Sequence, residues 1–146
     1  MAKVKPVPEG YHTVTPFLAL KDAHRAIDFY KRAFGAEERG RMPTPDGKIA
    51  HAEIRIGDSV VMLTEAIQEP VTPSSMYLYV EDVDAAFKRA VAAGAQATTD
   101  VADMFWGDRF GRVTDPFGVR WGIATHTQDL TPEEVGRRAA QAFKPS

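Results

Sequence analysis

The stretch LALKDAHRAIDFYKRAFGAE, Leu18 to Glu37, decides the fold because the chain contains a second version of it. The second version, LYVEDVDAAFKRAVAAGAQ, begins at Leu78, so the two are offset by sixty residues. Each reads as a strand, an aspartate at a helix N-terminus and an amphipathic helix closed by glycine. The offset holds from Leu18 to Ile27, and a one-residue deletion then brings Gly35 onto Gly94. Two unrelated amphipathic helices would not share this offset, so the sequence indicates a duplicated module.

Each helix is followed by strand signals. In the first half, IAHAEIRI alternates apolar and polar residues, a Gly57-Asp58 turn follows, and SVVMLT forms the next strand. In the second half, RFGRVT leads into the turn DPFG, and VRWGIAT follows. The segments EERGRMPTPDG and AQATTDVADMFWG each leave room for one more strand and a loop.

These signals predict an α+β fold of two tandem βαβββ modules within a single domain, residues 1–146. We expect the first module over about 11–66 and the second over about 73–126. A C-terminal helix over about 131–143 is predicted by TPEE, which places a threonine cap, a proline and a glutamate as in a capping box.

The composition narrows the function classes. A length of 146 residues suits one domain, and the absence of cysteine excludes disulfide scaffolds, thiolate metal sites and cysteine nucleophiles. A net charge of −2 with interspersed signs offers no basic face, so we expect no nucleic-acid partner. No apolar run approaches the length of a membrane span and the N-terminus has no hydrophobic signal core, which predicts a cytoplasmic protein without membrane contact.

The duplicated unit, together with AIDFYKRAFG in its first helix and DPFG before its last strand, resembles the vicinal oxygen chelate superfamily. This superfamily includes glyoxalase I, extradiol dioxygenases and bleomycin resistance proteins. The segments TPFLAL, PDGKIAHAEIRIGDSVVML and WGDRFGRVTDPFG are similar to its PhnB-like branch. The resemblance implies mixed sheets curled around a concave cleft, often completed by formation of a homodimer.

The resemblance also implies where a divalent metal would bind in metal-dependent members. Those positions fall on Thr15, Met62, Ser75 and Gly122 in this chain. Hydroxyl and thioether groups are poor ligands for such an ion and glycine has no side chain, so we expect no metal and no other cofactor. The glycine is consistent with a cleft that makes room for an organic ligand.

Strand alternation predicts which side chains line the cleft. If Thr15 and Ser75 face the cleft, so do Phe17, Tyr77 and Tyr79. On the strand IAHAEIRI, the apolar residues face the core, which leaves His51 and Glu53 on the side of the cleft. The repeat adds Phe110 and Arg112, and Trp106 lies on the preceding loop. The candidate ligand-binding residues are therefore Thr15, Phe17, His51, Glu53, Met62, Ser75, Tyr77, Tyr79, Trp106, Phe110, Arg112 and Gly122.

Simpler interpretations remain open for several of these residues. His51 and Glu53 also fit an ordinary polar pair on a solvated sheet face. Trp106 and its neighbours could form a hydrophobic plug, a dimer contact or a lid over the cleft. Asp108, Arg109 and Arg112 also fit a turn network, and His126 fits a surface residue.

Two functions are consistent with these residues. The first is a metal-free protein that binds an aromatic or anionic small molecule in the cleft, as bleomycin resistance relatives do. The alternative is a lyase, isomerase or dioxygenase, using a metal at other positions or His51 as a general base oriented by Glu53.

Overall fold

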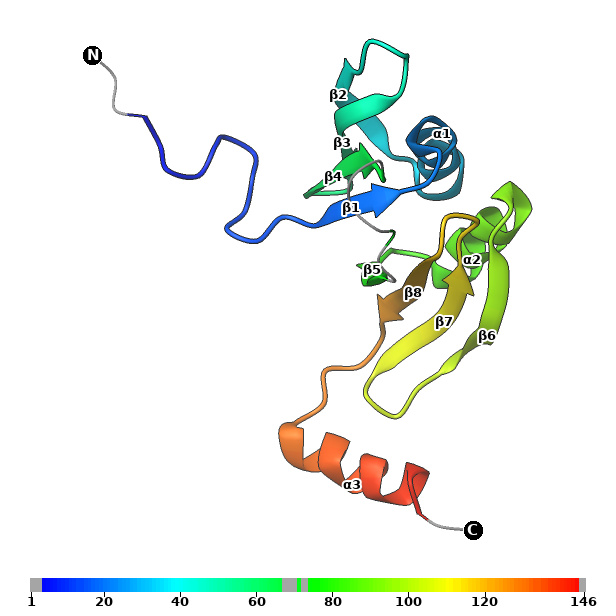
Figure 1. Ribbon diagram of the computed structural model, residues 1–146. Coiled ribbons are helices and arrows are strands. Elements are labelled where there is room, and N and C mark those ends of the chain that lie inside the picture. Colours follow the sequence, from blue (N-terminus) through cyan, green and yellow to red (C-terminus); the bar gives the residue numbers. More distant parts are fainter. Residues whose placement is uncertain (1–3, 67–70, 72–73, 145–146) are drawn as a thin grey trace. The chain divides into compact units, whose positions relative to one another are not determined.

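The computed structural model describes residues 4–66, 71 and 74–144, and the chain divides into two compact units between Ser74 and Ser75 (Figure 1). The first unit holds one four-stranded mixed sheet in the order β1-β4-β3-β2, in which β1 runs parallel to β4. Its elements are β1 (Phe17–Leu20), α1 (Ala23–Phe34), β2 (Glu37–Pro43), β3 (Ile49–Ile56) and β4 (Ser59–Glu65).

The second unit repeats this topology with the order β5-β8-β7-β6 and adds a terminal helix. Its elements are β5 (Ser74–Tyr79), α2 (Val83–Ala93), β6 (Gln96–Asp103), β7 (Asp108–Thr114), β8 (Val119–His126) and α3 (Pro132–Ala142). The predicted α+β fold of two βαβββ modules followed by a C-terminal helix is therefore confirmed. Within the described residues, no helix is long and apolar enough to cross a membrane.

Each sheet buries one face under its own helix. In the first unit, Ile27 and Tyr30 of α1 are fully buried, as are Ile54 and Leu63 on the strands with which α1 makes contact. In the second unit, Val113 is among the buried strand residues on the side of α2. Because strand side chains alternate, the other face of each sheet is left open for the polar and aromatic residues of the candidate site.

The helix ends follow the predicted repeat. The side chains of Asp22 and Asp82 accept hydrogen bonds from the third residue beyond, and Gly35 ends α1 in the left-handed conformation, with φ 69°. The repeat continues at the ends of the last strands. The Glu65 carboxylate accepts the first backbone N–H groups of α1, and the Thr125 hydroxyl, sixty residues later, accepts the Val83 N–H of α2.

The first strand is shorter than the sequence predicts. Thr15 was expected on it, but β1 begins at Phe17, and the first link to β4 is the Met62 N–H donated to the Pro16 carbonyl at 2.9 Å. Pro16 has no N–H to continue the ladder, and it restricts the residue before it. The Thr15 hydroxyl instead donates to the His12 carbonyl at 3.4 Å.

The DPFG turn fixes the register of the two strands that carry the site. The Asp115 carboxylate, 4% exposed, accepts the backbone N–H groups of Phe117 and Val119 and the indole N–H of Trp121. This arrangement ties β7 to β8 so that Arg112 lies directly opposite Gly122.

Candidate ligand-binding site

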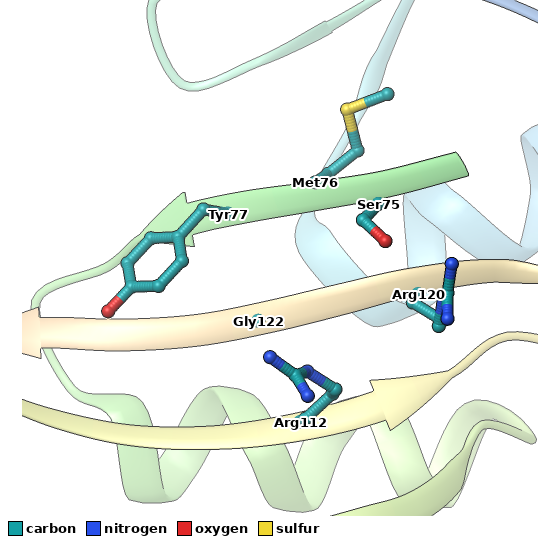
Figure 2. A pocket seen from close by; sticks show the side chains of 6 residues that line it. All are labelled: Ser75, Met76, Tyr77, Arg112, Arg120 and Gly122. Carbon is teal, nitrogen blue, oxygen red and sulfur yellow. The ribbon is translucent and has the colours of Figure 1, made fainter. Parts of the chain in front are cut away.

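The open face of the second sheet holds most of the predicted site residues. Arg112 pairs with Gly122 and Phe110 with Ala124 across β7 and β8, and opposite residues in a sheet share a face. On β5, Ser75, Tyr77 and Tyr79 are the exposed residues of an alternating pattern. Figure 2 shows Tyr77, Arg112 and Arg120 in front of the strands, with a helix behind them.

A cavity of about 320 Å³ lies on this face. Its lining residues come from three strands and are Ser75, Met76, Tyr77, Arg112, Arg120 and Gly122 (Figure 2). The volume is at the small end of the range for small-molecule sites, about 300 to 1,000 Å³. The cavity can therefore hold one or two rings with a polar substituent.

Aromatic rings cover part of Gly122. The rings of Tyr77 and Phe110 are stacked, with centroids 5.4 Å apart and an interplanar angle of 16°. A Cβ atom on Gly122 would lie 2.7 Å from Phe110 Cε2 and 3.2 Å from Tyr77 Cδ2. The absent side chain thus lets the aromatic pair lie close to the β8 backbone, and Gly122 also borders the cavity.

Two arginines give the cavity its charge. Arg112 and Arg120 are both exposed, and neither has an ion-pair partner within the described residues. The Arg112 guanidinium carbon lies 5.5 Å from the centroid of the Phe110 ring, within the range of a cation–π interaction. The cavity therefore combines positive charge with an aromatic wall.

A buried carboxylate organises the aromatic wall. Asp108 Oδ2 accepts the hydroxyl of Tyr77 at 2.6 Å, the hydroxyl of Tyr79 at 3.1 Å and the indole N–H of Trp106 at 3.1 Å. Asp108 Oδ1 lies 2.9 Å from His126 Nδ1. One carboxylate, with its side chain 3% exposed, thus joins residues of β5, β7, β8 and the loop before β7.

The hydrogen bonds in this network set the protonation states of its members. Burial raises the pKa of the Asp108 carboxyl, but its four donors, led by Tyr77, outweigh burial and hold that pKa below its ordinary value. Burial and the hydrogen bond to Asp108 raise the pKa of Tyr77 well above the usual range. Hydrogen bonds to Asp108 and Asp129 raise the pKa of His126. The network is therefore a carboxylate surrounded by neutral phenols and an imidazole that readily takes up a proton.

The open face of the first sheet has different chemistry. His51 Nε2 lies 3.5 Å from Glu53 Oε1, and the Phe17 ring is stacked on His51 at 5.9 Å. A hydrogen bond from Tyr11 is the main cause of a lowered Glu53 pKa, and Arg39 lies over the Tyr11 ring at 5.6 Å. Glu53 is thus held as a carboxylate with two polar neighbours.

The predicted residues fall into two groups. Seven share the second unit, namely Ser75, Tyr77, Tyr79, Trp106, Phe110, Arg112 and Gly122. Four lie on the open face of the first sheet, namely Phe17, His51, Glu53 and Met62. Thr15 precedes β1. The register supports the predicted repeat equivalence, because Glu53 lies opposite Met62 as Arg112 lies opposite Gly122.

Sequence reasoning missed Arg120, Asp108 and His126 as members of the site. Arg120 could have been found, since it lies two residues before Gly122 and strand alternation puts both on one face. Asp108 and His126 pair across β7 and β8, but no local pattern shows that two tyrosines and a tryptophan converge on one carboxylate.

The side chains at the metal positions implied by the resemblance do not fit a divalent ion. Thr15 and Ser75 offer hydroxyls, Met62 offers a thioether, and Gly122 offers only backbone beneath two aromatic rings. Catalytic divalent ions take about three imidazole or carboxylate ligands. No group of three such side chains suited to a metal was found among residues 4–66, 71 and 74–144.

A second hollow, of about 500 Å³, lies between the β6–β7 loop and α3. Its arginine, Arg138, is paired with Glu134 at 2.9 Å and also donates to Gln128. Phe105 meets Phe143 edge to face at 5.5 Å. These contacts attach α3 to the second unit, and the cavity at Gly122 remains the better candidate for a charged ligand.

Comparison with known proteins places this geometry in a family. An uncharacterised protein of Mycobacterium bovis is 41% identical over 134 residues, which cover 84% of this chain and 88% of the relative. The crystal structure of TioX from Micromonospora is 32% identical with a TM-score of 0.70, covering 79% of this chain and 98% of that one.

Two further structures have the same fold at lower identity. One is TnmS3 from Streptomyces, described as an antibiotic binding protein, which is 22% identical with a TM-score of 0.65 and covers 80% of this chain and 96% of its own. The other is a PhnB protein from Bacillus cereus, 21% identical with a TM-score of 0.65, covering 78% of this chain and 99% of its own.

The superfamily resemblance predicted from the sequence is confirmed, and the PhnB protein shares the fold. Residues 11–123 match the profile of the family described as Glyoxalase/Bleomycin resistance protein/Dioxygenase superfamily, and this chain belongs to that superfamily.

Proposed function

We propose that this protein binds an aromatic or anionic small molecule, without a metal ion, in the cavity beside Gly122. The observation that carries the proposal is one cavity with an aromatic wall and two arginines that lack ion-pair partners among the described residues. Such a composition recognises a planar ring and a negative charge together. The predicted ligand-binding residues of the first unit, Thr15, Phe17, His51, Glu53 and Met62, stay predictions.

A protein that shares this fold binds a small molecule, which supports binding as a function beside catalysis. TnmS3, which shares the fold, is described as an antibiotic binding protein. A fold alone does not determine function, so the argument depends on the residues of the cavity. They include donors and rings but no nucleophile paired with a base, which favours retention of a ligand over its conversion.

The binding proposal predicts that blocking the cavity abolishes ligand affinity. Ser75 is exposed at the cavity edge and takes no part in the Asp108 network, so a phenylalanine there fills space without breaking these hydrogen bonds. Aromatic and anionic compounds found by a thermal-shift screen should bind Ser75→Phe at least about tenfold more weakly, measured by calorimetry.

The matched control is Ser59→Phe, since Ser59 is an exposed serine at the start of β4 in the first unit. This variant should bind every compound as the parent does. Equal affinity of the parent and Ser75→Phe for all compounds would exclude the cavity as the site.

The metal-free part of the proposal is tested separately. Protein purified without chelator should contain less than about one tenth of an equivalent of zinc, nickel, iron or manganese, because the family positions lack suitable donors. Elemental analysis measures this content. About one metal per chain, lost when Met62 or Ser75 is changed, would contradict the proposal.

An enzymatic function is the second candidate, and one observation favours it. His51 lies beside the Glu53 carboxylate and stacks on Phe17, and histidine is the side chain that most often acts as a general base. Incubation with each bound compound, followed by mass spectrometry, separates the candidates. Unchanged ligand supports binding, whereas turnover that His51→Gln abolishes supports catalysis.

The proposal also includes one domain formed by both units, a homodimer and a cytoplasmic location. The superfamily resemblance suggests the first two, and the sequence suggests the third.

A further inference from the structure

We propose that Arg112 and Arg120 form a carboxylate-binding pair, and that the ligand of this cavity is an aromatic carboxylate. The inference rests on the proposed function and specifies the chemical class of its ligand. Three observations support it: the register of the two arginines, their lack of ion-pair partners among the described residues, and the hydrogen bonds by which the neighbouring Tyr and Trp donors are already bound to Asp108.

The register places the two arginines on one face as diagonal neighbours. Arg112 lies opposite Gly122, and Arg120, two residues before Gly122 on β8, lies opposite Thr114. Diagonal cross-strand residues are about 7 to 8 Å apart, within the reach of long side chains. Both arginines line the cavity, and Figure 2 shows Arg120 on the strand that contains Gly122 and Arg112 on the neighbouring strand.

Arg112 and Arg120 lack a nearby carboxylate among the described residues, whereas Arg109, Arg137 and Arg138 of the same unit each have one. Arg109, on the opposite face of β7, binds both carboxylate oxygens of Asp84 at 2.8 and 2.9 Å. Arg137 and Arg138 are paired with Glu134. Two like charges near one cavity repel each other, and a bound anion relieves that repulsion.

The one buried carboxylate on this face does not cancel the positive charge. Asp108 is enclosed by its own four donors and its pKa is lowered, so its charge is already compensated by Tyr77, Tyr79, Trp106 and His126. The donors that face the cavity are consequently the two guanidinium groups and the Ser75 hydroxyl.

The same network determines what the rest of the ligand must be. The Tyr77 hydroxyl donates to Asp108, so Tyr77, the aromatic residue in the cavity lining, presents its ring surface to the ligand. Arg112 already lies over Phe110. A planar ring can continue this stack while its carboxylate meets the planar guanidinium groups, which bind carboxylates in a bidentate manner.

The test uses 2-naphthoate, its neutral analogue 2-naphthamide and inorganic phosphate, titrated by calorimetry into the full chain. Glutamine lacks the charge that strengthens a hydrogen bond to a carboxylate, so Arg112→Gln and Arg120→Gln should each lower the affinity for 2-naphthoate at least about tenfold. Neither variant should change 2-naphthamide more than about twofold. Arg25→Gln removes the same charge from α1, where the Arg25 side chain is 78% exposed, and should leave both affinities unchanged.

The salt dependence and the remaining probes complete the design. Affinity for 2-naphthoate should fall as NaCl rises from about 0.05 to 0.5 M, because screening weakens charge pairing, while that for 2-naphthamide should not. Inorganic phosphate should bind more weakly than 2-naphthoate, since it lacks the ring. Phosphate binding as tight as that of 2-naphthoate would overturn the aromatic requirement.

The result that overturns the carboxylate assignment is an unchanged ratio of 2-naphthoate to 2-naphthamide affinity in both arginine variants. If the Ser75→Phe variant still loses its affinity for 2-naphthamide, the proposed function stands and only the assignment of a carboxylate ligand fails. If neither naphthalene compound binds the parent protein while another compound is lost in Ser75→Phe, the assignment again fails without the function.

Discussion

Replacing Asp108 with alanine is expected to lower the free energy of unfolding by about 2 to 4 kcal/mol, measured by urea denaturation. The change removes the acceptor of Tyr77, Tyr79 and Trp106 at once. Asp108 is 2% exposed, so little water can take its place without rearrangement of the wall. Donors left without partners in a partly buried site cost more than the hydrogen bonds themselves contribute.

Two control variants make this prediction specific. Asp108→Asn keeps one acceptor oxygen and the shape of the side chain, so it should lower the free energy of unfolding less than Asp108→Ala does. Asp103→Ala removes a carboxylate that is 79% exposed and makes a long, 3.4 Å contact with Arg109. The free energy of unfolding of this variant should stay within about 0.5 kcal/mol of that of the parent. An Asp108→Ala variant as stable as Asp103→Ala would show that the network does not stabilise the fold.

The network also has a distinctive dependence on pH. The pKa of His126 is raised in the folded chain, so its stabilising contribution is complete below about 6.5 and is lost as the pH rises through the folded value. The pKa of Asp108 is lowered, so its contribution is present above about 4 and is lost in acid. In Asp108→Asn the His126 contribution should shrink, and stability should change less between neutral and mildly alkaline pH than in the parent.

The fold could be predicted from the sequence because the information was local and repeated. Asp22 with Gly35, and Asp82 with Gly94, mark the ends of the two helices, and the structure has the same caps. The error at Thr15 has a local cause as well, since Pro16 interrupts hydrogen bonding and strand alternation does not show this.

The candidate site was only partly predictable. Alternation correctly puts Tyr77, Phe110 and Arg112 on one face with Gly122. It does not indicate that the Trp106 loop turns toward Asp108, because that position depends on packing between segments about thirty residues apart. The sequence also suggested that Gly122 leaves room for a ligand, whereas Phe110 takes part of that room.

The role of Gly122 is open to a direct experiment. Gly122→Ala should lower the free energy of unfolding by about 1 to 3 kcal/mol, because the new Cβ atom would meet Phe110 Cε2 at 2.7 Å. Phe110 is 4% exposed and is held by the stacked Tyr77 ring and the Trp106 ring, whose centroid is 5.6 Å away, so it has little freedom to move.

The control is Gly40→Ala on β2. A Cβ atom there meets nothing within 4 Å. Alanine restricts the unfolded chain more than glycine does, so this variant should be as stable as the parent or more stable by up to about 1 kcal/mol.

A double-mutant cycle identifies the neighbour responsible. Phe110→Leu removes the ring atoms that approach Gly122, so Gly122→Ala should cost little in that background, with a coupling energy of about 1 to 2 kcal/mol between the two sites. Additive losses would mean that the glycine is required by the β8 backbone and not by the ring. Coupling would instead show that the missing side chain at Gly122 is what lets the stacked rings of Phe110 and Tyr77 lie against β8.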